Sequence, residues 1–314
     1  MANTFIKATQ VVQMARLLLQ REIVLPQLVW SDFTKQQFQY AYNDTVTMSV
    51  PAVMSSRSRT MRSSTGLTAD DLTETSVDVK LDTHVYKLLN ITDEQLTLDI
   101  KDFGAQVLAP QIRAVAEGLE DVIAAELAAA TSASTDVQFL EGTDDPYRVL
   151  LLARKALNDL NVPQDGRVFV CGSSVELALL ESDRISKASN SGDAIASTAL
   201  TDATIARVAG FRIVQSNALD PDEAYAFHRT AVAFGACAPA IPQGASDGSQ
   251  VSSEGIGMRY LRDYNPTNST GPVDRSLVDV FAGAASVEET DPDESGATPE
   301  NRRLVKIDFT PEES

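Results

Sequence analysis

The sequence predicts an α+β protein, and two kinds of pattern predict it. Residues 44–54 and 77–85 alternate apolar with polar side chains, as half-buried β-strands do. Residues 111–130 place apolar side chains three and four positions apart, which is the spacing of one face of an amphipathic helix. The chain has 314 residues, of which 43% are hydrophobic, so it is large and apolar enough for one large or two ordinary packed domains.

Residues 1–42 are expected to form an N-terminal arm. The segment is too short to bury its apolar side chains on itself, and it is weakly basic in a chain whose formal net charge is −18. Apolar surface of this kind usually packs against another molecule, so we expect the arm to contact a neighbouring subunit, chiefly through Trp30, Phe33 and Phe38. An equally weighted alternative is an N-terminal helix folded onto the core of its own chain. The apolar residues of the arm are Leu17, Leu18, Leu28, Trp30, Phe33, Phe38 and Tyr42.

Residues 43–98 are expected to form an extended loop, built as a long β-hairpin. The two alternating runs are its strands, and the small polar stretch SSRSRTMRSSTG between them is its basic tip. An isolated two-stranded hairpin is only marginally stable in water, so this one needs a surface to lie on. The favoured interpretation is that the tip docks on an acidic neighbouring copy, and the alternative is an ordinary hairpin at the edge of a sheet. The charged residues expected at the contact are Arg57, Arg59, Arg62, Asp70, Asp71 and Glu74.

The rest of the chain mixes helices with short strands. Pro110 is either the first-turn residue of the long helix or a kink inside a longer one. A second helix is predicted over about 146–160, and PQDGRVFVCG predicts a turn followed by a buried strand. Residues 288–314 are acidic and contain proline, which predicts a mobile tail, although RRLVKIDF within it could add a strand.

Residues with catalytic potential are few. Two cysteines and two histidines are too few for a disulfide framework or a usual zinc site. Cys171 lies in VFVCGSSVELALL, which resembles a nucleophile elbow in outline, but Val170 stands where that motif requires glycine and no histidine partner is recognisable. A buried structural thiol is favoured, and a cytoplasmic α/β enzyme with a Cys171-centred site is the alternative. Phosphate-binding and calcium-binding loop motifs are also missing, so no catalytic, cofactor-binding or metal-binding residue is predicted.

The charge balance restricts the partners. With 44 acidic and 26 basic residues, the chain does not favour contact with nucleic-acid phosphates over its whole surface. A container for DNA is compatible with this sign, because an acidic inner wall would not hold the DNA tightly. No run of 18 apolar residues predicts a membrane-spanning helix, and the N-terminal residues lack the features of a secretory signal.

Several stretches, taken in order, resemble the major capsid proteins of tailed bacteriophages with the Hong Kong 97-type fold, especially those of actinobacterial phages. DFGAQVLAPQIRAVAEGLEDVIAAELA resembles the start of the family's spine helix, and VPQDGRVFVCGSSVELALL resembles the strand–turn–helix that begins its axial domain. IARVAGFRIVQSNAL resembles its helix–glycine–strand segment, and AFHRTAVAFGACAPAIPQGA with GMRYLRDYNPTNSTGPVDRSLVDVFAGAASV resembles its return to the peripheral domain. The similarity covers most of residues 1–290.

The resemblance implies the architecture of that fold and six parts of the chain. It also implies that the extended loop lies over the neighbouring subunit, while its return strand leads into the spine helix. The six parts are an N-terminal arm (1–42), an extended loop (43–98), a peripheral domain with the spine helix (99–162), an axial domain (163–250), a return to the peripheral domain (251–287) and an acidic tail (288–314).

By the same resemblance, we expect a structural protein and not an enzyme. It would assemble with itself, as hexamers and pentamers, into the icosahedral head that encloses double-stranded phage DNA, and it would be found in the virion. Assembly in the host cytoplasm, separate scaffolding and portal proteins, and non-specific contact with the packaged DNA are further expectations, with no cofactor and no membrane partner. An encapsulin-like compartment shell, which shares the fold, is a further alternative.

Overall fold

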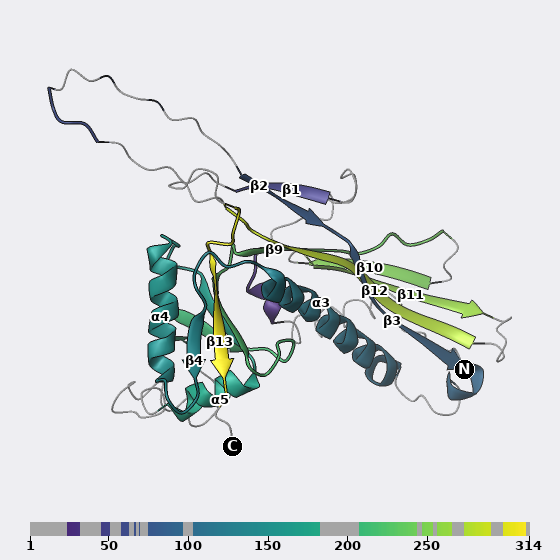
Figure 1. Ribbon diagram of the computed structural model, residues 1–314. Helices are drawn as coiled ribbons and strands as arrows, with labels where there is room; N and C mark the ends of the chain where they lie inside the picture. The colour runs from purple at the N-terminus through teal and green to yellow at the C-terminus, as the bar shows by residue number, and fades with distance from the viewer. Residues whose placement is uncertain are drawn as a thin grey trace.

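The structure is a computed structural model of the chain. The strands that the structure describes form three sheets, and the long helix α3 (Ala109–Ala129) crosses between the two larger ones (Figure 1). The described residues are 24–31, 45–50, 58–62, 66, 69, 75–96, 103–182, 207–243, 247–253, 256–265, 273–289 and 298–311.

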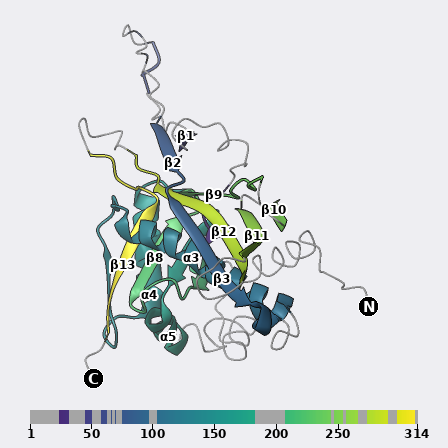
Figure 2. The ribbon, with the colours of Figure 1, turned by 90° about the vertical axis from the view of Figure 1, so that its right-hand side faces the viewer.

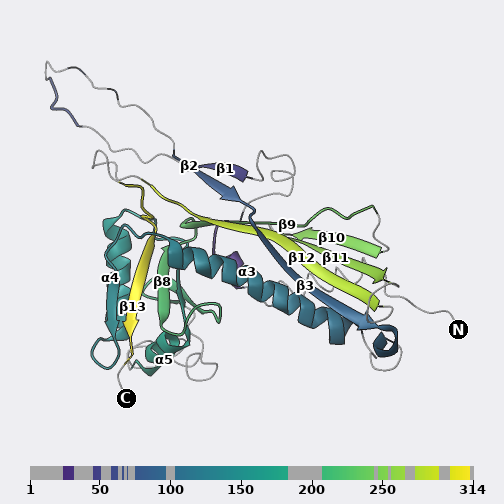
Figure 3. The same ribbon diagram turned by 45° about the vertical axis from the view of Figure 1, so that its right-hand side comes forward.

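A five-stranded antiparallel sheet, called here the long sheet, runs along α3 (Figure 3). Its central strand, β12 (Val273–Ser286), pairs with β11 on one side and with β3 on the other, and toward its end it also pairs with β9. The outermost strand, β10, pairs with β11. The partner strands are β3 (Thr83–Thr92), β9 (Val232–Cys237), β10 (Asp247–Ser253) and β11 (Ile256–Asn265).

A six-stranded mixed sheet stands at the other end of the molecule, in the order β4-β13-β8-β5-β7-β6. Strands β4, β13, β5 and β7 run in one direction, and β8 and β6 run in the opposite direction. The strands are β4 (Val137–Leu140), β5 (Arg167–Cys171), β6 (Arg207–Val208), β7 (Phe211–Gln215), β8 (Glu223–His228) and β13 (Leu304–Thr310).

The third sheet is a two-stranded hairpin of β1 (Thr45–Val50) and β2 (Thr75–Lys80). The register runs from Thr45 opposite Lys80 to Val50 opposite Thr75, as the two alternating runs predict. The hairpin lies above the long sheet, where β2 contacts β9 and β12 (Figure 2). The predicted strand over 77–85 is therefore two strands, because the chain leaves β2 at Leu81 and joins the long sheet as β3.

Helix α3 has the apolar face that the spacing predicts. Ile112, Leu119, Ile123 and Leu127 are fully buried along it. Pro110 lies in its first turn, where the missing N–H costs least, but a π-helical turn over Gly104–Leu108 precedes it, so the helical stretch begins earlier. Within the described part of the chain, α3 and the other helices are too short or too polar to cross a membrane.

Two hydrophobic cores cover the two faces of the six-stranded sheet. The first lies between α3, one face of that sheet and one face of the long sheet, so α3 joins the two sheets into one body. The second lies on the opposite face, under α4 (Pro146–Asp159) and α5 (Ser173–Glu181). Asp145 caps α4, since its Oδ1 accepts a hydrogen bond of 3.1 Å from the N–H of Tyr147.

Two of the expected segments are divided between the two larger sheets. β4 and α4 fall within the expected peripheral segment, 99–162, but they pack with the six-stranded sheet. β9 and β10 fall within the expected axial segment, 163–250, but they pair in the long sheet. The strand that RRLVKIDF could add within the expected tail, 288–314, is present as β13, which lies between β4 and β8 because Leu304, Val305 and Ile307 are buried in the two cores.

Candidate assembly surfaces

The root of the arm packs on its own chain. Leu25 and Leu28 are buried in the core against α3, in and after a 3-10 turn at Leu25–Gln27. The backbone N–H of Trp30 donates to the carbonyl of Val232 at 3.1 Å, and the carbonyl of Trp30 accepts from the N–H of Phe234 at 2.9 Å. These two bonds attach the arm to β9. Of the two expectations for the arm, packing on the core of its own chain holds for Leu28, which the body of the same chain buries, and contact of Trp30 with a neighbouring subunit stays a prediction. Phe33 and Phe38 lie outside the described residues.

A buried carboxylate ties this arm root to the body. Glu120 of α3 is 9% exposed, and its Oε1 accepts hydrogen bonds from the N–H groups of Val24 (2.5 Å) and Leu25 (3.2 Å). Its Oε2 accepts a hydrogen bond of 3.2 Å from Ser216 Oγ, just after β7. The charged side chain thus holds the arm root, α3 and the six-stranded sheet together through charge-assisted hydrogen bonds.

The base of the hairpin is also fixed to its own chain. Val79 is fully buried against Ala233 and Cys237 of β9, and Val77 is buried against Val287. The surface on which the base of the hairpin lies is therefore that of its own chain, because the packing of β2 over β9 and β12 removes these two valines from water.

The close approach of the hairpin requires a glycine in β12. A Cβ atom at Gly283 would lie 1.8 Å from the carbonyl oxygen of Lys80 and 3.2 Å from the Cα of Leu81. Both are backbone atoms, which a side-chain rotation cannot move away. Gly283 is therefore the point at which β2 crosses β12.

The tip of the hairpin is exposed. Arg59, Met61 and Arg62 lie at a turn, where Met61 is 89% exposed and Arg62 has a positive φ of 64°. Arg57, Asp70, Asp71 and Glu74, the other residues predicted for the contact, lie outside the described residues. A hairpin with a fixed base and an exposed tip is suited to contacting a second molecule.

The face of the long sheet opposite α3, called here the outer sheet face, carries large apolar side chains that sequence reasoning missed. Val85 of β3 points toward α3, since a Cβ at Gly118 would touch it, so its neighbours in the strand point outward. Among these, Tyr86 is 60% exposed and Leu88 is 45% exposed. Phe281 of β12 lies beside them, with its ring centre 4.9 Å from that of His84. Alternation along β3 indicated a strand, but which face stays uncovered depends on the position of α3.

A buried ion pair crosses this outer face. The carboxylate of Asp279 is fully buried and accepts hydrogen bonds from Arg259 Nε at 2.9 Å, from Arg259 Nη2, and from His84 Nε2 at 3.0 Å. The three side chains connect β11, β12 and β3. They fix the register of these strands beneath the exposed aromatic residues.

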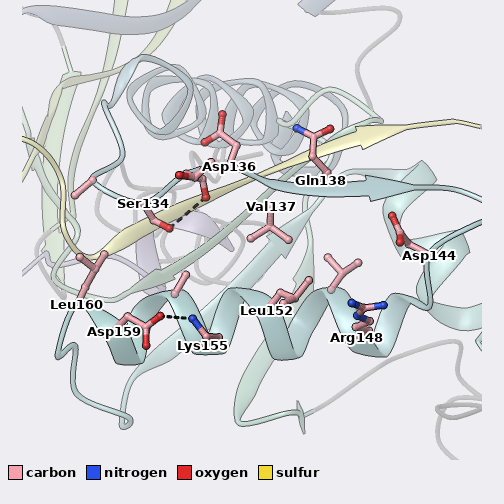
Figure 4. A pocket seen from close by; sticks show the side chains of 14 residues that line it. Ser134, Asp136, Val137, Gln138, Asp144, Arg148, Leu152, Lys155, Asp159 and Leu160 are labelled. Atoms are coloured by element: carbon pink, nitrogen blue, oxygen red, sulfur yellow. Dashed lines mark hydrogen bonds and ion pairs between the residues drawn. The ribbon is translucent and has the colours of Figure 1, made fainter.

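A groove lies between β4 and α4 and is shown in Figure 4. It has a volume of about 560 Å³, and its rim carries both acidic and basic side chains. Lys155 and Asp159 form an exposed ion pair of 2.6 Å on the helix side, while Asp136 and Gln138 lie on the strand side. The mixed charges and exposed ion pair give this groove no specific chemistry.

Cys171 is not placed for catalysis. It is fully buried at the end of β5, and burial together with the nearby charge of Glu176 raises the pKa of its thiol to about 12. The thiol is therefore protonated at neutral pH, when only the thiolate is nucleophilic. The geometry favours the structural interpretation of Cys171 over the enzyme alternative. Within the described residues, no group of three or more metal-ligating side chains lies close enough together to hold a metal ion.

The family and the fold follow from comparison with known proteins. A family model described as phage capsid protein matches residues 74–275. A comparison with curated proteins finds no match.

Three solved structures share the fold. A structure from Mycobacterium phage Che8 has a TM-score of 0.61 at 20% identity, covering 92% of this chain and 91% of that one. The capsid of cyanophage P-SCSP1u has a TM-score of 0.62 at 13% identity, and the match covers 99% of this chain and 91% of that one. The mature capsid of bacteriophage PhiM1 has a TM-score of 0.56 at 11% identity, and the match covers 87% of this chain and 84% of that one. These similarities confirm the predicted α+β class and capsid fold. With a family match that spans more than half of its length, the chain belongs to the phage capsid protein family.

Proposed function

We propose that this major capsid protein forms an icosahedral head, built from pentamers and hexamers, around double-stranded DNA. The observation that carries the proposal is the β1–β2 hairpin, which is fixed at its base by Val77 and Val79 and exposes Arg59 and Arg62 at its tip. Such a hairpin gives each subunit a contact outside its own body. The tip would lie on the neighbouring subunit, where its basic residues meet the surface of an acidic chain.

The shell would be held by many weak contacts between copies. The outer sheet face, with Tyr86, Leu88 and Phe281, offers apolar area that contributes about 25 cal/mol for each Å² buried in a contact. Charge pairs at the hairpin tip would direct and align the contact more than strengthen it, because exposed ion pairs contribute about 1 kcal/mol or less. Separate scaffolding and portal proteins would complete the head in the host cytoplasm, and an acidic wall would contact the packaged DNA non-specifically.

The test is electron microscopy of the purified chain beside a tip variant. The unaltered chain should form closed particles, and Arg57→Glu with Arg59→Glu and Arg62→Glu should lower the particle yield without changing the melting temperature of the subunit. A control with two exposed charges reversed on α4, Arg148→Glu with Lys155→Glu, should leave the yield unchanged. A small closed oligomer from the unaltered chain would contradict the head, whereas an unchanged yield from the tip variant would contradict only the tip contact.

A further inference from the structure

A group of arginines lines two adjoining cavities at one end of the six-stranded sheet. The cavities have volumes of about 700 and 320 Å³ and share Asp165, Arg167 and Arg207. They lie where β5 and β7 begin, beside the root of the arm. The arginine cavity, as we call the pair, is lined by Arg154, Arg167, Arg207, Arg212 and Arg229. Asp165 is the one carboxylate among the described residues that line them, so the lining is net positive in a chain of net charge −18.

The innermost arginine is buried with its charge. Arg167 is 4% exposed, and its guanidinium donates to the carbonyls of Pro163 (2.8 Å) and Val162 (2.6 Å) and to Asn158 Oδ1 (2.8 Å), all of which are neutral. Burial, and then the charge of Arg154, lower the pKa of Arg167. A cation bound only by neutral groups in a buried position keeps much of its attraction for an anion.

The surroundings of the cavity are positive as well. Burial and the charge of Arg303, with smaller contributions from Arg229 and Arg167, lower the pKa of His228 at the end of β8, although a hydrogen bond with the backbone of Asp165 opposes this. Arg207 and Arg212 are exposed at the mouth of the cavity, whereas Arg167 lies in its wall. The arrangement therefore offers two accessible guanidinium groups in front of a fixed positive interior, which suits the bidentate binding of oxyanions.

The shape and lining favour a polypeptide carboxylate over a nucleic acid. Leu28, Val29 and Ile213 form apolar parts of the wall, and a DNA duplex, which presents its phosphates on a convex surface, leaves such a recess unfilled. Stacking of unpaired bases needs aromatic side chains, and the described residues that line the two cavities include none. A loop with acidic and apolar residues fits both kinds of wall.

The opposite end of the same sheet is acidic. Strands β4 and β7 end there, and the loops that follow them carry Glu141 and Asp144, and Asp220 and Asp222. Asp220 and Asp222 are exposed on either side of Pro221. The six-stranded sheet thus has an arginine-rich end and a carboxylate-rich end, which two copies in a head-to-tail arrangement would bring together.

We propose that the arginine cavity of one copy binds the Asp220–Pro221–Asp222 loop of the next copy. The inference rests on the proposed function, since it names one contact of the shell. The two surfaces are different, so the contact is heterologous, and repeating it around an axis closes a ring. Carboxylates of the incoming loop pair with Arg207 and Arg212, and Pro221 contacts the apolar wall.

Charge reversal and its rescue test the contact. Arg207→Glu with Arg212→Glu should raise the protein concentration needed for assembly about tenfold or more, because like charges then face each other across the contact. Asp220→Arg with Asp222→Arg should have the same effect. All four substitutions in one chain should restore assembly, since the pairs are then re-formed with their charges exchanged. The control is Arg148→Glu with Lys155→Glu, which changes the net charge as much as Arg207→Glu with Arg212→Glu does and should assemble normally. Melting curves establish that each variant folds.

Each other outcome separates the explanations. If the unaltered chain does not assemble at all, the proposed function fails and the cavity contact fails with it. If the unaltered chain assembles and the Arg207→Glu, Arg212→Glu variant assembles equally well, only the cavity contact is wrong. The contact is also contradicted if the control variant loses as much assembly as the arginine variant, or if the fourfold exchange does not restore assembly. Normal assembly with weaker DNA retention by the variant would assign the cavity to nucleic acid and overturn the proposal.

Discussion

Replacing Gly283 by alanine should lift the base of the hairpin off the long sheet. The new Cβ would stand 1.8 Å from the carbonyl oxygen of Lys80, whereas carbon and oxygen atoms normally approach to about 3.3 Å. β2 would therefore have to move by about 1.5 Å relative to β12, or separate from it. Lys80 and Leu81 cannot yield by rotating a side chain, since the atoms that clash belong to the backbone.

The cost follows from what β2 buries. Val79 is fully buried and Val77 is 7% exposed, and burying a valine contributes about 1.5–3 kcal/mol. Complete separation of the hairpin base would thus cost about 3–6 kcal/mol, and a partial shift would cost less. A loss of about 3 kcal/mol corresponds to roughly a hundredfold increase in the opening of this segment.

Hydrogen exchange measures this opening directly. In the Gly283→Ala variant, the amides of β2 should lose about a hundredfold in protection, while those of α3 should keep theirs. Gly66→Ala is the matched control, because a Cβ at Gly66 would have nothing within 4 Å. It should change neither the protection of the β2 amides nor that of the α3 amides. Unchanged protection of β2 in the Gly283→Ala variant would refute the argument that the hairpin base depends on this crossing.

Two further predictions concern charged groups. Asp279→Asn should lower the free energy of unfolding by about 3 kcal/mol, because it leaves the largely buried Arg259 without its carboxylate. Lys155→Ala removes one partner of an exposed ion pair and should change the free energy of unfolding by less than about 0.5 kcal/mol. Urea denaturation measures both, and equal effects of the two substitutions would contradict this prediction. Burial, and then the charges of Glu288 and Asp82, raise the pKa of Glu126 above its usual range, although the Ser286 N–H bond of 2.7 Å opposes this. The stability that protonated Glu126 contributes is present below its unfolded pKa and is lost as the pH rises through the folded pKa. Glu126→Gln should therefore stabilise the protein at pH 7 and not at pH 4. An equal stabilisation at both pH values would contradict this prediction.

Local patterns in the sequence predicted those elements whose form depends on near neighbours. The spacing of Ile112, Leu119 and Ile123 predicted the buried face of α3, because one helix face meets one core. The alternation at 44–54 and 77–85 predicted the pairing of β1 with β2. The break at Leu81 was not predictable, since alternation continues unchanged while the strand changes its partner from β1 to β12.

Features that depend on distant partners were predicted only in part. β13 has a good strand pattern, but it follows an acidic stretch, and its place between β4 and β8 depends on residues far away in the chain. For the arm root, a neighbouring subunit and the core of the same chain were equally weighted, because nothing local shows that Glu120 and β9 receive it. The arginines of the cavity are spread over residues 154–229 and form no motif in the sequence, so only the meeting of α4, β5, β6 and β7 reveals them.

The central claim is that each copy keeps its arm root and hairpin base on its own body and uses exposed surfaces to bind other copies. Electron cryo-microscopy of particles assembled from the purified chain tests this directly. The account predicts closed shells in which residues 24–31 and 75–80 pack on their own subunit while the tip around Arg59 and Arg62 touches the neighbour. Isolated subunits or small oligomers in place of shells, or a tip lying on its own subunit, would contradict it.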